Sequence, residues 1–134
     1  MRTIGVLLFC WSGLVWANAC PQAKTTFELN QCLAEQLEQQ EVVLHHYLAE
    51  ARARHLDDDV VVEAIDEAQL RWLDYRQQQC DSINRVWRDG SIRGVMTLNC
   101  SIRMTRLRTH QIWYSYLTFM DSTPPLLPEP QLAD

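Results

Sequence analysis

The feature that most constrains this chain is a long stretch, from Thr25 to about Leu56, that contains neither glycine nor proline. It opens with Thr25-Thr26-Phe27-Glu28, which matches the capping box: the first threonine caps a helix and the glutamate reaches back to it. Apolar residues then recur on one helical face, at Leu29, Leu33, Leu37, Leu44, Leu48 and Ala51. The stretch is therefore predicted to form one helix with a buried leucine stripe.

A second helix is predicted over residues 60–81. The run Asp57-Asp58-Asp59 ends the first helix and suits the start of the second, because carboxylates stabilise the free amides of a helix N-terminus. Calcium ligation by these aspartates is disfavoured, since the glycine and glutamate of a calcium loop are missing at the required offsets. The predicted apolar stripe of this helix steps by three and four residues through Ile65, Ala68, Trp72 and Tyr75.

A third helix is predicted from about Ser91 or Ile92 to Met120, after a loop that contains Asp89-Gly90-Ser91. Gly94 falls near its start, where a glycine costs a helix little. Its predicted buried side consists of Val95, Leu98, Ile102, Trp113 and Tyr116, widened by Leu107, Tyr114 and Leu117. No segment alternates with period two for long enough to indicate a strand. The predicted fold class is all-α, a small three-helix antiparallel bundle or array.

Residues 1–19 have the pattern of a secretory signal peptide. A positive Arg2 precedes a short apolar run, and the alanines of Ala17-Asn18-Ala19 suit cleavage between Ala19 and Cys20. Two alternatives are a membrane anchor and lipidation of Cys20, but no stop-transfer segment follows, and Ala17 and Asn18 are atypical of a lipoprotein signal. We predict a periplasmic or secreted protein with one helical domain, residues 20–120, and a Pro-rich flexible tail, residues 121–134.

Four cysteines follow the predicted cleavage site, and an even number in an exported chain favours disulfides over a metal site. Three pairings are possible. The predicted helices favour Cys20–Cys32 and Cys80–Cys100, because Cys20 and Cys32 flank the start of the first helix, and Cys80 and Cys100 lie where the second helix ends and the third begins.

Charge is divided unevenly along the chain. Residues 20–59 hold eight acidic and three basic residues, whereas residues 82–120 hold six arginines and one aspartate. Removal of Arg2 with the signal peptide takes the formal net charge from −5 to −6. An acidic domain does not suit nucleic acid, but it allows attraction to a cationic protein. The alternative is internal: the acidic first helix packs beside the arginine-rich third.

No catalytic constellation is present. The histidines are predicted to be surface or half-buried residues, because zinc needs three or four converging donors; they are His45, His46, His55 and His110. No zinc-protease, serine-hydrolase or phosphate-binding motif occurs. We therefore predict a protein that is not an enzyme and has no metal or cofactor.

The segment AQLRWLDYRQQQC, residues 68–80, resembles the signature of the LprI-type lysozyme-inhibitor N-terminal family through Ala68, Gln69, Trp72, Tyr75, Arg76 and Cys80. The opening is similar too, at Cys20, Thr25, Glu28, Leu29, Asn30 and Cys32. The C-terminal part of the family pattern is matched with imperfect spacing, at Cys100, Thr105, Arg106, Arg108 and Thr109. Where many relatives have a Gly-Gly turn, this chain has Asp89-Gly90-Ser91.

The resemblance implies a small exported bacterial helical domain with two disulfides, associated in part of the family with lysozyme inhibition. The signature residues Trp72, Tyr75, Arg76, Glu28 and Asn30 are expected to be structural. The expected function is non-catalytic binding of a lysozyme-type muramidase; the alternative is an envelope structural or interaction protein, such as an immunity or accessory factor, with another periplasmic partner. No membrane contact beyond export is expected, and the oligomeric state is left open.

Overall fold

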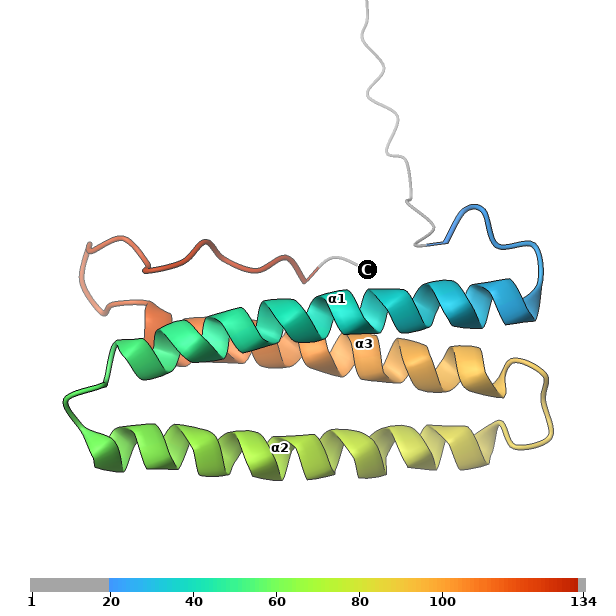
Figure 1. Cartoon of the computed structure of the whole chain (residues 1–134), viewed down its shortest axis with the longest axis horizontal. Helices are drawn as coiled ribbons and strands as arrows, with labels where there is room; N and C mark the ends of the chain where they lie inside the picture. The colour runs from blue at the N-terminus through green and yellow to red at the C-terminus, as the bar shows by residue number, and fades with distance from the viewer. Residues whose placement is uncertain (1–19, 133–134) are drawn as a thin grey trace, which may run out of the picture.

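The computed structural model describes residues 20–132, which form a bundle of three long helices and a C-terminal segment that runs back along it (Figure 1). Successive helices run in opposite directions, and the third helix packs against the first two. No strand occurs in residues 20–132. The predicted all-α antiparallel three-helix fold is confirmed. The elements are α1 (Thr26–Ala53), α2 (Asp59–Val86), α3 (Arg93–Ile112) and a π-helical turn η1 (Trp113–Leu117).

The helix starts follow the local sequence signals. The Thr25 hydroxyl accepts a hydrogen bond from the Glu28 amide at 3.1 Å, and the Glu28 carboxylate accepts one from the Thr25 amide at 3.1 Å. Asp58 caps α2 by accepting from the Val61 amide at 3.3 Å. The capping box and the helix-start role of the aspartates are therefore confirmed. The ends shift: α1 stops three residues earlier than predicted, and α2 runs on to Val86.

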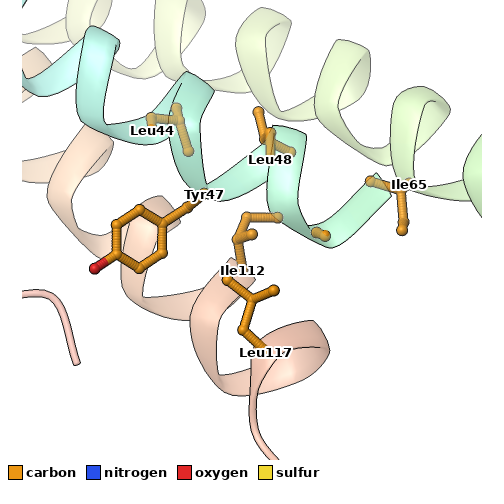
Figure 2. Packing of buried hydrophobic residues seen from close by; sticks show 7 residues of the cluster. Leu44, Tyr47, Leu48, Ile65, Ile112 and Leu117 are labelled. Atoms are coloured by element: carbon orange, nitrogen blue, oxygen red, sulfur yellow. The ribbon is translucent and has the colours of Figure 1, made fainter. Parts of the chain in front are cut away.

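The main core lies where α1, α2 and α3 meet η1. Figure 2 shows its side chains converging from all four elements. They are Leu44, Tyr47, Leu48 and Ala51 of α1, Ile65 of α2, Ile112 of α3 and Leu117 of η1. A second cluster, at the other end of α1 and α3, joins Leu33 to Val95 and Ile102. The leucine stripe of the first helix is confirmed, and each fully buried Leu or Ile stabilises the fold by about 1.5–3 kcal/mol.

The end of the third helix differs from the prediction. The α-helix stops at Ile112, and η1 ends at Leu117 instead of Met120, with Thr118 in an extended conformation. Leu107 and Tyr114 were expected on the buried side but are 52% and 70% exposed. The physical reason is that α3 contacts two helices, so one of its sides stays in water, and the wider π turn changes which residues face inward.

Residues 118–132 return along the bundle beside α1 (Figure 1). The Leu126 amide donates to the Leu117 carbonyl at 2.9 Å, and Leu127 packs against the main core. The sequence predicted a free tail, because its prolines block helix formation. The prolines do not prevent an extended conformation, and in that conformation the segment contacts α1 and α3. No helix of residues 20–132 is long and apolar enough to cross a membrane.

Candidate functional site

The inward stripe of α2 is not the apolar one that the sequence predicted. Ile65 is buried and Trp72 packs half-buried against the main core. The prediction was wrong for Ala68 and Tyr75, which are exposed, Tyr75 by 59%. The positions that face inward include Gln69 and Arg76, so the stripe steps by four, three and four residues and is partly polar. Apolar periodicity alone therefore misplaces it.

Arg76 lies at the meeting point of the three helices. Its Nη1 donates to the Thr105 hydroxyl on α3 at 2.8 Å, and its Nη2 pairs with the Glu41 carboxylate on α1 at 2.7 Å. The guanidinium carbon is 5.1 Å from the centroid of the Trp72 ring, within cation–π range. With only 17% of its side chain exposed, Arg76 acts inside the bundle rather than on a partner surface.

Arg108 of α3 approaches Trp72 as well, at 5.8 Å from the ring centroid. Its Nε donates to the side-chain Oε1 of the buried Gln69 at 3.0 Å, and its Nη1 donates to the side-chain Oε1 of Gln111 at 2.9 Å. Burial lowers the pKa of the Arg108 guanidinium. The signature segment and α3 thus form a hydrogen-bonded polar layer that holds the two helices together.

Each of the four cysteines within residues 20–132 forms a disulfide bond. The bonds are Cys20–Cys32, which ties the first residues to α1, and Cys80–Cys100, which ties the end of α2 to α3. The predicted pairing is confirmed. One sulfur cannot form both a disulfide and the thioether of a lipid anchor, so the Cys20–Cys32 bond argues against lipidation. Ala19, the predicted cleavage between Ala19 and Cys20, and the rest of residues 1–19 lie outside the described part of the chain.

Asn30 and Gly94 form a close contact between α1 and α3. A Cβ atom placed on Gly94 would lie 2.5 Å from Asn30 Oδ1. The Asn30 amide is held in place, because its Nδ2 donates to the Thr26 carbonyl at 2.9 Å. The sequence predicts only that Gly94 costs the helix little, whereas in the structure this glycine makes room for Asn30. The co-occurrence of a signature Asn and a helical Gly was the available signal.

The histidines behave as the sequence predicted, as surface or half-buried residues. His110 pairs with Glu129 at 3.0 Å, His55 packs edge-on against Tyr116, and His46 does so against Tyr47. Within residues 20–132, no group of three or more His, Cys, Asp or Glu side chains is placed to hold a metal.

The outer face of α1 carries three of the eight acidic residues of the segment 20–59. The exposed residues Glu28, Glu35 and Glu38 share this face with the exposed Val42. The acidic α1 does lie beside the arginine-rich α3, as expected if the uneven charges of the two segments attract each other within the bundle. These three carboxylates nevertheless face water, so part of the acidic charge is available to a partner.

Comparison with known proteins decides the family. The model of the family "Lysozyme inhibitor LprI" matches residues 17–112. The chain belongs to the LprI family. The LprI match contains both disulfides, the capping box and the polar layer around Trp72, and it ends at the last residue of α3. None of the curated proteins and none of the solved structures compared with the chain matches it.

Proposed function

We propose that this protein is an exported, non-catalytic inhibitor that binds a lysozyme-type muramidase and occludes its substrate cleft. The observation that carries the proposal is the family match over residues 17–112. It includes every helix that builds the bundle, apart from the turn η1.

Charge supports a cationic partner. The chain without its predicted signal peptide carries a formal charge of −6, since −5 for the whole chain includes Arg2. The exposed carboxylates of Glu28, Glu35 and Glu38 concentrate part of it on the outer face of α1. Opposite charges raise the rate of encounter and favour one orientation of docking. A basic lysozyme is a partner of that kind.

Export is supported by the signal-like residues 1–19 and by the two disulfides. Disulfides form and persist in oxidising compartments such as the bacterial periplasm. Muramidases that attack the cell wall reach their substrate in or from the same compartments, so the inhibitor and its target would meet there.

The test is a cell-wall clearing assay with the purified mature protein, residues 20–134, against lysozymes of several classes. We expect a saturable loss of lytic activity with at least one of them at a stoichiometric amount of protein. Undiminished lysis by every enzyme at saturating protein would refute the proposal. A pull-down from periplasm that recovers a different partner in stoichiometric amount would favour the accessory-factor alternative.

The role of charge is tested separately. Replacing Glu35 and Glu38 by Gln keeps size and helix propensity but removes two of the outward charges. We expect inhibition to weaken and its salt dependence to fall, because less Coulomb attraction remains to be screened. The matched control replaces Glu63 and Glu67, which are exposed on α2. Equal weakening by both pairs would show that net charge matters and the α1 face does not.

A further inference from the structure

The C-terminal segment is fixed to the bundle at its start. Arg54, the C-cap residue of α1, donates from Nη1 to the carbonyls of Tyr116 and Thr118 and lies over the Phe119 ring, at 4.2 Å from its centroid. These contacts hold the reversal of chain direction after η1. The segment then runs back beside α1 (Figure 1). Residues 127–131 lie in a groove that we define by Val43, Tyr47, Thr109, His110 and Trp113, the α1–α3 groove.

Two aromatic side chains of the groove bind main-chain carbonyls of the segment. The Tyr47 hydroxyl donates to the Pro128 carbonyl at 2.7 Å, and Trp113 Nε1 donates to the Leu127 carbonyl at 2.9 Å. Burial raises the pKa of Tyr47, so its hydroxyl keeps the proton that it donates. Because the donors contact carbonyls, an extended peptide needs no free N–H here, and proline, which has none, fits. Proline-rich ligands are commonly recognised in this way.

Two side chains of the segment add selectivity. Leu127 packs against the main core beside Tyr47, and the Glu129 carboxylate lies 3.0 Å from His110 Nε2. The sequence that the groove accepts is therefore an apolar residue, a proline and an acidic residue in succession.

Beside Pro130 and Gln131, the segment and the groove enclose a depression of about 270 Å³ that is lined also by Gln40, Val43, Tyr47, Arg106 and Thr109. The segment and η1 also fall outside the LprI match, which ends at residue 112, whereas most of the groove falls inside it.

We propose that the α1–α3 groove is a recognition site for an extended, proline-containing segment of another protein, and that residues 126–130 occupy this site in cis. The segment is then a built-in competitor. A tethered ligand acts at an effective concentration on the order of millimolar. A partner segment therefore binds only if its affinity is high enough to displace the tethered segment, or if another event has already removed that segment from the groove.

The experiment uses the full mature chain and a fluorescent peptide with the sequence of residues 122–132. In one variant, Leu127→Asp with Glu129→Lys weakens the tethered segment and leaves the groove intact. We expect the peptide to bind this released variant at least tenfold more tightly than the wild type in fluorescence anisotropy. A peptide that carries Asp in place of the leucine before proline serves as the control and should bind neither protein.

The groove itself is tested by Tyr47→Phe in the released variant, which removes the donor and keeps the ring. Peptide binding should weaken about tenfold. If circular dichroism shows that the double variant is unfolded, the single variant Glu129→Gln takes its place. It removes only the exposed contact to His110 and should still make the peptide bind measurably more tightly than it binds the wild type.

Absence of peptide binding to a folded released variant overturns the proposal, as does binding that Tyr47→Phe leaves unchanged. Concentration-dependent dimers of the wild type that disappear in the released variant would overturn the assignment to another protein, because they would place the segment of a second copy in the groove. Lysozyme inhibition is measured independently, so the two proposals can fail separately.

Discussion

Arg76 donates a hydrogen bond to the hydroxyl of Thr105 at 2.8 Å, and through it α2 is joined to α3. The other arm of the same guanidinium reaches Glu41, so one side chain connects all three helices. The planar fork of arginine suits this role, since it presents several donors in fixed directions. Thr105 is fully buried, and a lost bond there is not replaced by water.

Arg76→Lys is expected to destabilise the fold by about 1–3 kcal/mol, because the ammonium group keeps the charge but cannot reach both acceptors. Urea denaturation followed by circular dichroism measures the change. Arg71→Lys is the matched control on the same helix: its side chain is 83% exposed and pairs with Glu67 at 3.6 Å, a contact worth under about 0.5 kcal/mol. Equal effects of the two substitutions would contradict an interior role for Arg76.

Gly94→Ala is expected to cost about 1–3 kcal/mol although alanine favours helices, since the added methyl overlaps Asn30. Gly90→Ala is the control. A Cβ there meets its nearest neighbour, the Trp87 carbonyl oxygen, at 3.5 Å, which is ordinary contact. It should change the stability by less than about 0.5 kcal/mol.

A double-mutant cycle shows whether the overlap is the cause. Asn30→Ala removes the atoms that the new methyl meets, so Gly94→Ala should cost less in that background. Thermal unfolding of the four proteins gives the coupling energy. Additive effects would mean that Gly94 matters for a reason other than Asn30.

Much of the fold follows from patterns within single segments. The leucine spacing, the capping box and the aspartate run place α1 and the start of α2, because these signals act between residues a few positions apart. Once the helices are placed, the disulfide pairing follows from which cysteines fall near one another.

Contacts between helices are not encoded in that way. Gln69, Arg76 and Arg108 are polar, so apolar periodicity does not place them inside. In the structure Arg108 donates to Gln69 and Arg76 donates to Thr105, so each has a partner between the helices. The same limit applies to the C-terminal segment. Its prolines rule out a helix, but only the folded positions of Tyr47 and Trp113 supply the donors that it meets.

Glu28 makes the stability depend on pH. Hydrogen bonds from the backbone amides of Lys24 and Thr25 hold the pKa of its carboxyl below the ordinary value of 4.5. A group whose pKa is lowered by folding stabilises the fold above its unfolded pKa, and this contribution is lost as the pH falls through the folded one. Glu28→Gln should therefore flatten the decline of stability below about pH 5, measured by urea denaturation at a series of pH values.

Thr25→Ala separates capping from titration. It removes the hydroxyl that caps α1 but leaves the two amides that lower the Glu28 pKa most. The variant should lose about 1 kcal/mol at every pH and keep most of the decline in acid. If Glu28→Gln shows the same decline as the wild type, the capping box does not set the acid sensitivity.

The Cys20–Cys32 bond predicts an unlipidated N-terminus. The intact mass of the exported protein should correspond to a chain that begins at Cys20 and lacks four hydrogens because of its two disulfides. Non-reducing peptide mapping should join Cys20 to Cys32 and Cys80 to Cys100. Replacing the second pair by alanines should cost about 3 kcal/mol. Replacing the first pair should lower the stability less, because the Cys20–Cys32 bond closes the shorter loop, with a separation of 12 residues against 20. A diacylglyceryl group on Cys20, or a Cys32–Cys80 link, would contradict both the predicted processing and this arrangement of the helices.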